Sequence, residues 1–594
     1  MKTLLSTLLG VLVTFCSFSQ NLEWLASGGG LKSDKATTIV VDDNGFSYVT
    51  GYYNEQAQFG SFDTGFSFQS SKEVFVAKVD PMGNYVWVKN GINYFDDRGL
   101  GLCLDPAGNV YVTGTCWGGL DWGSLSVYNP QGGTDQIFVV KLDTNGNEVW
   151  MKNAGNQDGS VGFSVNENGD PQTLYQDDHG QDLASDSQGN IFVTGFLSNI
   201  DTNPHDALFD AISIPLQPED SIAFVAKMDN DGNWLWVETF QGIYQHRDNA
   251  IAVDDDDNVY VTGGFVGTKN FGTTTLTSFG DEDIYVVKYD GNGNFQWVAQ
   301  AGAPDSLADR GDGIVYGHDG HMYVTGEFRG KAAFGTDTVN NYGGDDTDRD
   351  CFVAKISKNG VWKWASKAGS SKGKDRGTGI CVNTSGNIFV SGQFSGPAKF
   401  SGSDIELASN GDSVQAFIAA IDSLGNWRWA KSGGGPHFDR GADVDCDENC
   451  NVYFTGYYTN SFSFDGQALT SSGGKDVFTG KLADACFGYA PPAPPTGPEE
   501  EEFCEVLETN VFTPNGDQIN EELVFSENCN MDATVLIFNR WGEIVYESND
   551  LLQSWDGTTK SGQMVNAGTY FYSIEVRSKF GQIEKKTGFI TVLL

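Results

Sequence analysis

Seven copies of a short motif, Tyr/Phe-Val-Thr-Gly or a close variant, restrict the folds open to this chain more than any other feature of its sequence. Each copy follows a short apolar segment and an Asp/Gly/Asn turn, and it precedes a Phe-Val-Ala-Lys-like segment. Six copies are then followed by a turn that leads to tryptophan. No sustained helical period interrupts these units, so each unit predicts four short strands in an all-β protein. The motif glycines are Gly51, Gly114, Gly195, Gly263, Gly326, Gly392 and Gly456.

Repetition of four-stranded units predicts a seven-bladed β-propeller over residues 20–487, with a linear solenoid as the alternative. The ends of the array favour the propeller. The seventh unit ends after Phe478–Lys481 without a tryptophan strand, and a segment of that type around Trp24 stands ahead of the first unit. We expect the N-terminal Trp24 strand to become the outer strand of the last blade. This arrangement closes the ring and removes two exposed strand edges.

Composition and charge agree with an exported, strand-rich chain. Glycine accounts for 75 of the 594 residues, and 13% of the residues are aromatic, which suits tight turns and argues against disorder. The net charge of −43 disfavours nucleic acid and anionic lipid as partners. Residues 1–19 resemble a signal peptide more than a membrane anchor, because the apolar stretch is short. Beyond them we expect no transmembrane segment.

The repeats resemble the SBBP family of bacterial secreted propeller repeats. The family pattern is an Asp-Arg-Gly entry, a strand into Asp-x-x-Gly-Asn, then Tyr-Val-Thr-Gly and Phe-Val-Ala-Lys. All seven units match this pattern in part, so the resemblance covers roughly residues 21–485. It implies a propeller fold and leaves the activity open, because propellers host unrelated functions.

A second domain follows a spacer rich in proline and glutamate, residues 488–502. Residues 503–594 alternate apolar and polar in short segments, which predicts a small Ig-like β-sandwich. Four motifs occur there in order, and they resemble the gliding-motility-associated C-terminal domain of Bacteroidota, the type B sorting signal of the type IX secretion system. The resemblance implies the type IX machinery as a partner and passage through the periplasm to the outside of the cell or its surface. The motifs are Val511–Asp517, Ile537–Gly542, Ser554–Gly557 and Ala567–Tyr572.

Two features of the second domain carry further expectations. Cys504 and Cys529 flank its first strands, and we expect a disulfide between them, with free thiols as the alternative. Asn515, Asp517 and Asn520 offer oxygen ligands in a loop that contains glycine, where a calcium ion and a plain Asx-type turn are both compatible with the sequence. Apart from calcium, we expect no cofactor.

The repeat region holds most of the cysteines. The chain has 10 cysteines, and removal of Cys16 with the signal peptide leaves an odd number, so at least one thiol is unpaired in a monomer. Cys446 and Cys450 share one turn, and the sequence is equally compatible with a local bridge and with separate thiols.

A basic residue stands at the entry to the first strand of each unit, and an aspartate precedes six of these residues. If the tryptophan strand is outermost, the next strand is innermost, and the basic residues should surround one mouth of the central channel. One interpretation is an Asp–Arg network that locks neighbouring blades, and the other is a ring that binds an anionic or sugar ligand. The residues are Lys35, Arg98, His179, Arg247, Arg310, Arg376 and Arg440.

No motif nominates an enzyme. The histidines form neither His-Glu-x-x-His nor a Cys/His zinc pattern, and the chain has no Gly-x-Ser-x-Gly elbow or P-loop. An extra stretch, residues 155–176, should overhang the channel mouth. We therefore predict a non-enzymatic binding or adhesion protein with a polysaccharide or surface-protein ligand. The alternatives are a polysaccharide-cleaving enzyme, a lyase or hydrolase acting near His179 and Arg247, and a structural surface-layer component.

Overall fold

Strands make up every regular element in the part of the chain that the computed structural model describes. The chain separates into two compact units, Met1–Tyr489 and Ala490–Leu594. The predicted signal peptide and spacer lie outside the described residues. The structure describes residues 20–67, 71–129, 134–156, 161–165, 171–175, 178–199, 204–218, 221–241, 249–304, 308–344, 348–371, 373–409, 413–487, 511–514, 522–525, 532–559, 562–577 and 583–593.

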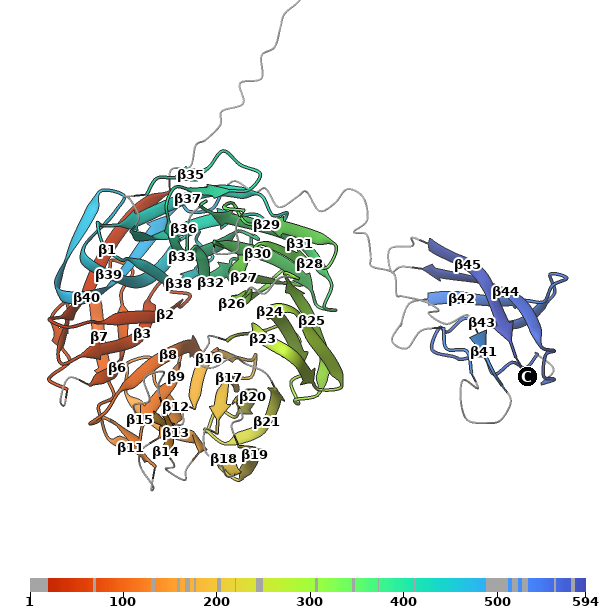
Figure 1. Cartoon of the computed structure of the whole chain (residues 1–594), viewed down its shortest axis with the longest axis horizontal. Helices are drawn as coiled ribbons and strands as arrows, with labels where there is room; N and C mark the ends of the chain where they lie inside the picture. The colour runs from red at the N-terminus through yellow and green to blue at the C-terminus, as the bar shows by residue number, and fades with distance from the viewer. Residues whose placement is uncertain are drawn as a thin grey trace, which may run out of the picture. The chain divides into compact units, whose positions relative to one another are not determined.

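In the first unit each repeat forms four antiparallel strands, and the sets are arranged around a centre as the blades of a β-propeller (Figure 1). From inner to outer strand, the sets are β2 (Lys35–Val41), β3 (Ser47–Asn54), β6 (Lys72–Val79), β7 (Tyr85–Asn90); β8 (Asp97–Leu104), β9 (Val110–Trp117), β12 (Asp135–Leu142), β13 (Glu148–Asn156); β16 (His179–Ser185), β17 (Ile191–Ser198), β20 (Ser221–Met228), β21 (Trp234–Gln241); β22 (Ala250–Val253), β23 (Val259–Phe271), β24 (Thr274–Tyr289), β25 (Phe295–Gly302); β26 (Arg310–Gly317), β27 (His321–Arg329), β30 (Arg349–Ser357), β31 (Trp362–Gly369); β32 (Arg376–Val382), β33 (Ile388–Ser395), β36 (Val414–Ile421), β37 (Trp427–Gly434); and β38 (Arg440–Cys446), β39 (Val452–Phe464), β40 (Gln467–Ala483), β1 (Asn21–Gly30).

Short hairpins between the second and third strands connect neighbouring sets. The first strand of a hairpin pairs with the outer strand of the preceding set, as β18 does with β13 and β28 with β25. In the fourth and last sets the hairpin continues the long strands themselves. The separate hairpins are β4 (Ala57–Phe59) and β5 (Phe62–Asp63), β10 (Gly119–Trp122) and β11 (Leu125–Tyr128), β18 (His205–Phe209) and β19 (Ile212–Leu216), β28 (Lys331–Phe334) and β29 (Asp337–Asn340), and β34 (Ala398–Phe400) and β35 (Glu406–Leu407).

The N-terminal strand completes the last set, as the missing tryptophan strand indicated. Strand β1 pairs antiparallel with β40 from Asn21↔Ala483 to Gly28↔Val477. The Trp24 indole is 8% exposed, and its Nε1 donates a hydrogen bond to the carbonyl oxygen of Pro81, in the first set, at 2.9 Å. Trp150 makes the corresponding bond to the carbonyl of Asn230 in the next set, at 3.0 Å. The contact that closes the ring therefore has the same form as an internal contact between blades.

The recurring motif residues have steric and hydrogen-bonding roles. The Thr325 hydroxyl donates to the carbonyl oxygen of Phe352 on the third strand, at 2.8 Å. At Gly326 a Cβ would overlap the carbonyl oxygen of Arg310 on the facing inner strand. The glycine after the basic residue of the next set, Gly377, leaves room for the Thr325 hydroxyl. The motif thus lets each inner strand pack closely against two neighbours.

The Asp-x-x-Gly-Asn segments form turns between the first and second strands. In the second set, Asp105 Oδ1 accepts the backbone N–H groups of Ala107 and Asn109, both at 2.9 Å. Gly108 has φ of 80°, a conformation that favours glycine. The Tyr111 hydroxyl, from the Tyr-Val-Thr-Gly motif, donates to the other Asp105 oxygen at 3.0 Å. The turn and the motif that follows it therefore act as one element.

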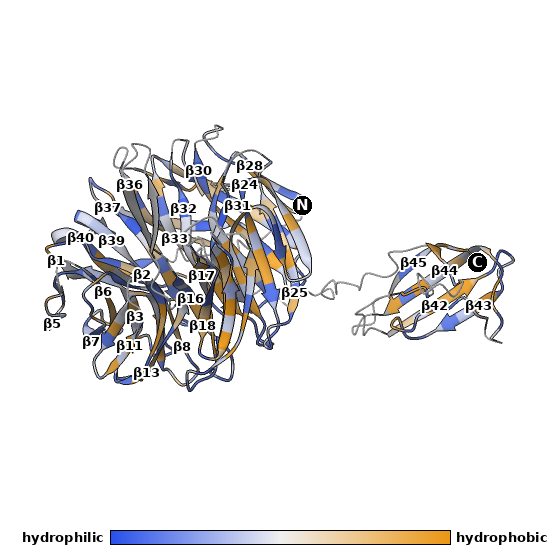
Figure 2. Ribbon diagram, turned by 60° about the horizontal axis from the view of Figure 1, so that its bottom comes forward, coloured by the Kyte–Doolittle hydropathy of each residue, from blue (hydrophilic) through white to orange (hydrophobic). Residues whose placement is uncertain are grey.

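The second unit contains a five-stranded sheet around a separate core. Hydrophobic residues are concentrated on the strands of both units (Figure 2). Trp555, Phe525 and Leu551 are fully buried in the second core. The named strands of the described residues form one sheet, so the two-sheet Ig-like sandwich stays a prediction. The strand order is β41 (Val511–Phe512), β45 (Ile583–Val592), β44 (Gly568–Arg577), β42 (Asp532–Phe538) and β43 (Ile544–Ser548), with β41 parallel to β45.

Candidate functional site at the channel mouth

The inner strands of the propeller enclose a cavity of about 500 Å³. Residues from every inner strand, β2, β8, β16, β22, β26, β32 and β38, line it, together with Tyr52 of β3 and Tyr457 of β39. Its wall combines cationic side chains, threonine hydroxyls and carboxyl groups. This volume lies within the usual range for ligand pockets.

The predicted basic residues occupy equivalent places but have different surroundings. Each described one pairs with the residue after the motif glycine, as Lys35 does with Tyr52 and Arg310 with Glu327. Of the predicted ring, Lys35, Arg376 and Arg440 line the cavity, whereas Arg98, His179 and Arg310 are not among its lining residues. Arg247 lies outside the described residues, as do Cys504, Cys529, Asn515, Asp517 and Asn520 of the second unit.

Two of the arginines take part in a buried ionic network. Asp312 accepts hydrogen bonds from Nε of Arg310 at 3.0 Å and from Nε of Arg376 at 2.6 Å, which joins β26 to β32. Glu327 binds Arg310 at 3.1 Å and Arg349 at 2.9 Å. Burial by itself raises the pKa of Glu327. The charges of Arg376, Arg310 and Arg349 outweigh burial and lower this pKa below its ordinary value. At this position the expected network between blades is present.

Two other ring members are also engaged with acidic groups. Arg98 lies 3.4 Å from Asp96, which also pairs with Lys72. The His179 imidazole is 8% exposed, stacks on Phe196 with ring centroids 4.6 Å apart, and lies 3.7 Å from Asp135. Arg98 and His179, which we expected at the channel mouth, are therefore already engaged in contacts within the protein.

The aspartates before the basic residues accept hydrogen bonds from backbone amides. Asp309 accepts the N–H groups of Ala303, beyond the preceding outer strand, at 2.7 Å and of Arg329, on the second strand of its own set, at 2.8 Å. The aspartates thereby connect neighbouring sets through backbone amide groups that would otherwise lack hydrogen-bond partners at the blade junction. Pairs of amides are bound in the same way by Asp34, Asp178, Asp375 and Asp439.

At the junction of the last and first sets, Lys35, Arg440 and Lys475 contact aromatic rings or one another, and none of them forms an ion pair within the described residues. In the described part of the chain, no carboxylate lies within salt-bridge distance of Lys35, Arg440 or Lys475. The Lys35 ammonium lies 5.6 Å from the centre of the Tyr52 ring and 5.0 Å from that of Tyr457. Lys475 lies 5.0 Å from the same Tyr457 ring. Burial and then the charges of Lys35 and Arg440 lower the pKa of Lys475.

Sequence reasoning missed Lys475, although its position is readable from the motifs. It stands three residues before the aromatic residue of the Phe-Val-Ala-Lys-like segment, where the first repeat has Lys72 and the second has Asp135. Asp135 faces His179 of the next set, so Lys475 faces Lys35 by the same relation. Aligning the repeats on this motif would have shown an aspartate facing a histidine at one junction and two lysines facing each other at the other.

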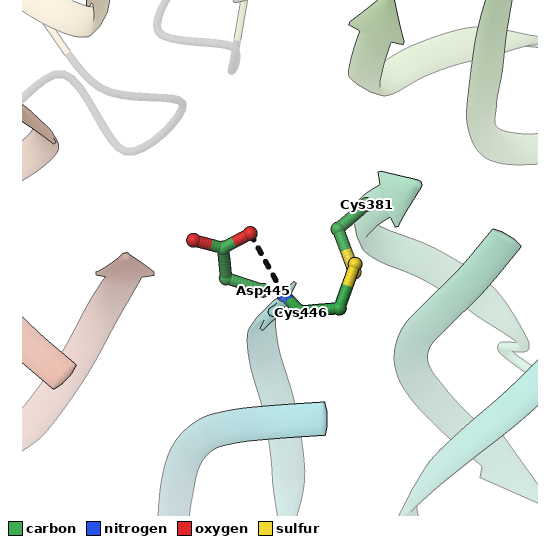
Figure 3. Close-up of side chains that lie close together, drawn as sticks. All are labelled: Cys381, Asp445 and Cys446. Atoms are coloured by element: carbon green, nitrogen blue, oxygen red, sulfur yellow. Dashed lines mark hydrogen bonds between the residues drawn. The ribbon is translucent and has the colours of Figure 1, made fainter. Parts of the chain in front are cut away.

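A second cluster combines two thiols and a carboxyl on adjacent inner strands. The sulfur atoms of Cys381 and Cys446 point toward one another beside Asp445 (Figure 3). Asp445 already accepts the N–H groups of Cys446 and Val41, both at 2.8 Å, and burial raises the pKa of both thiols. Two neutral thiols and an engaged carboxyl provide less than the four-ligand shell of structural zinc, so we assign no metal there.

Of the two alternatives left open for Cys446 and Cys450, the local bridge is wrong. Cys450 forms a disulfide with Cys486, and Cys446 is a free thiol. The segment after β40 returns to this turn, where the Ala485 N–H donates to the carbonyl oxygen of Cys450 at 2.9 Å. This tertiary contact brings Cys486 to Cys450, and nothing in the local sequence reveals it.

Comparison with known proteins identifies both regions. The chain carries a CHU_C type IX secretion signal domain over residues 506–592 and an SBBP beta-propeller repeat over residues 25–54. Both resemblances seen in the sequence are thereby confirmed, and the protein is a secreted or cell-surface β-propeller protein. No helix in the described residues is long and apolar enough to cross a membrane.

More distant similarities do not assign an activity. The uncharacterized WD repeat-containing protein L264 of Acanthamoeba polyphaga mimivirus is 24% identical over 308 residues, which is 44% of this chain and 22% of that protein. The chain thus matches about a fifth of that curated relative's length. A point mutant of NanB sialidase from Streptococcus pneumoniae is 9% identical, with 76% of this chain and 94% of that chain covered and a TM-score of 0.34. PorZ, a surface component of the type-IX secretion system of Porphyromonas gingivalis, is 10% identical, with 96% and 100% covered and a TM-score of 0.14.

Proposed function

We propose that this exported propeller is a non-enzymatic binding or adhesion protein whose ligand, a polysaccharide or a surface protein, enters the channel mouth. The observation that supports the proposal is the cavity of about 500 Å³ with Lys35, Arg376 and Arg440 in its wall. Charged side chains that line a cavity give orientation and specificity to a bound ligand. Arg376 is held by Asp312, which leaves Lys35 and Arg440 as the ring members best placed to bind.

The contacts of His179 favour binding over cleavage. A polysaccharide lyase or hydrolase at this mouth would use His179 as an acid or base, and such a group must reach the substrate. His179 is buried against Phe196 and Asp135 and is not among the residues that line the cavity. No contact among the described residues favours the surface-layer alternative.

We further propose the route by which the protein leaves the cell. Residues 1–19 would direct the chain to the periplasm, and the secretion signal domain at residues 506–592 would then engage the type IX machinery for passage across the outer membrane. Release from the cell and retention on its surface both agree with this route.

A glycan and surface-protein array probed with the mature full-length protein tests the binding function, together with an assay for new reducing or unsaturated sugar ends. We expect a retained ligand without new ends. Turnover that His179→Ala abolishes would overturn the proposal in favour of the enzyme. Ordered self-assembly without any retained ligand would overturn it in favour of a surface layer.

A further inference from the structure

The junction between the last and first sets differs in charge from the junctions between the first and second sets and between the fifth and sixth sets. Lys475 of β40 faces Lys35 of β2, and Arg440 of β38 lies close enough to lower the pKa of Lys475. Like charges repel unless a counter-charge lies between them. We call Lys35, Arg440, Lys475, Tyr457 and Phe438 the seam cluster.

Equivalent junctions carry the acidic group that the seam cluster lacks. Between the first and second sets, Asp96 neutralises Lys72 and Arg98. The residue that corresponds to Asp96 at the seam is Ser33, which has no charge.

The junction between the fifth and sixth sets is neutralised from another position. There Glu327, the residue after the motif glycine, binds Arg310 and Arg349. The corresponding residue of the last set is Tyr457, whose ring lies beneath Lys35 and Lys475. Both positions that supply a counter-charge elsewhere are uncharged at the seam.

The aspartates that directly precede Lys35 and Arg440 in the sequence are hydrogen-bonded to backbone amides. Asp34 accepts the N–H groups of Gly30 at 2.6 Å and Asn54 at 2.8 Å. Asp439 accepts those of Gly435 at 2.6 Å and Thr459 at 3.0 Å. Burial raises the pKa of Asp34 to about 7 and that of Asp439 to about 6, which reduces the negative charge that they present near neutral pH.

In a chain of net charge −43, a group of cations that finds no counter-charge among the described residues favours a bound anion. Lys35 and Arg440 line the cavity, and Lys475 adjoins them through Tyr457. A cavity of about 500 Å³ accommodates one or a few sugar units, whereas a surface protein could insert no more than a short loop. A polymer charged on every unit, such as nucleic acid, would be repelled by the rest of the surface, which favours a polysaccharide that carries carboxylates on only some of its units.

The surroundings of the cations suit a sugar. Phe438 is 39% exposed and stacks on Tyr457, so it offers an apolar face beside the charges. In the wall of the same cavity, the Thr37 and Thr38 hydroxyls donate to the carbonyl oxygens of Gly99 at 3.0 Å and Leu100 at 2.6 Å. Their oxygens therefore keep acceptor capacity for the hydroxyl groups of a ligand.

We propose that the seam cluster binds a carboxylate-bearing sugar unit of an acidic polysaccharide, with the carboxylate between Lys35, Arg440 and Lys475 and the sugar hydroxyls toward the threonines. This inference rests on the proposed binding function and specifies its ligand. The ligand carboxylate takes the place of the acidic side chain that other junctions have, so the charges of the three cations are neutralised only in the complex.

The test uses isothermal titration of the mature full-length protein with a panel of short uronic-acid oligosaccharides. Their methyl esters, which keep the sugar backbone and remove the charge, are the matched ligands. We expect an acid to bind about tenfold or more tightly than its ester, the ratio for one charged hydrogen bond, and we expect this preference to weaken with salt.

Variants separate a binding role from a structural one. Lys35→Gln and Lys475→Gln should each weaken binding of the acid about tenfold. They should leave the melting temperature unchanged or raise it, because each removes a repulsion. Lys72→Gln, at the equivalent but neutralised junction, should leave binding of the acid unchanged.

Three outcomes would overturn the inference: equal affinity for acid and ester, unchanged affinity in both Lys35→Gln and Lys475→Gln, or no binding of any uronic-acid oligosaccharide. If the array still retains a neutral glycan or a protein, the proposed binding function stands and only the ligand assignment fails. If the array retains nothing, the proposed function itself fails.

Discussion

At the scale of single residues, the repeat motif recurs because the strands of a blade and of its neighbour pack closely at these positions. Gly326 lets the second strand approach the inner strand of its own set, and Gly377 lets the inner strand of the next set approach Thr325. The Thr325 hydroxyl is hydrogen-bonded to the third strand. These residues explain why the motif recurs, and they carry no chemistry of their own.

Replacing Gly326 by alanine should destabilise the propeller by about 1–3 kcal/mol, because the new methyl group overlaps the carbonyl of Arg310. Urea denaturation followed by tryptophan fluorescence measures the change. Gly313→Ala is the control, since it lies on the facing strand and its nearest neighbour would be 3.2 Å away. Equal effects of the two substitutions would contradict the steric explanation.

At the scale of strands, β1 is the element on which the ring depends. It pairs with β40 across the closing junction, and its Trp24 ring packs on Gly83 of the first set as Trp87 packs on Gly146 of the second. The closing junction is therefore built from the same parts as the internal ones.

Trp24→Ala and Trp87→Ala should consequently cost similar amounts, about 3–5 kcal/mol each for a buried tryptophan. Chemical denaturation of the two variants measures both. A large loss for Trp87→Ala beside an unchanged transition for Trp24→Ala would show that the closing junction contributes little to stability.

The strands and their closure could be predicted because motif spacing and a missing tryptophan are properties of the linear sequence. The neutralisation of individual cations could not be predicted in the same way. Asp96 and Glu327 stand at different motif positions, so the repeat pattern does not reveal which basic residue finds a partner. The bond between Cys450 and Cys486 likewise depends on where the chain returns after β40. Features shared by all the repeats could be predicted from the sequence. Features that differ between repeats, such as the partners of individual cations, became known only from the structure.

At the scale of the whole molecule, many buried carboxyl groups make stability depend on pH. Burial raises the pKa of Asp182, Asp375 and Glu73 to about 7 each. In the unfolded chain they titrate near 3.8 for aspartate and 4.5 for glutamate. Between those values and 7 the folded state binds more protons than the unfolded state, so the free energy of unfolding falls as pH rises.

The propeller should therefore melt several degrees higher at about pH 5 than at about pH 8. Thermal melting in high salt measures this, because salt screens repulsion between surface charges and leaves the buried groups almost unaffected. A melting temperature that stays constant, or rises with pH over this range, would contradict the assignment of raised pKa values to the buried carboxyl groups.

Removal of residues 503–594 should leave the propeller inside the cell envelope, because the type IX secretion signal domain lies there. Cell fractionation with antibody detection shows where the truncated protein accumulates. Undiminished appearance of the truncated propeller in the medium or on the surface would show that this domain is dispensable for export.

The pairing of β1 with β40 also sets the time at which folding can finish. Its contacts join residues 21–28 to residues 477–483, which gives the protein contacts of very high sequence separation. During synthesis β1 is made first but can pair only after β40 has been made. A shorter portion of the chain therefore cannot form the closed ring. The ring is therefore completed only after the last repeat has been made, and until then the N-terminal strand lacks its partner β40.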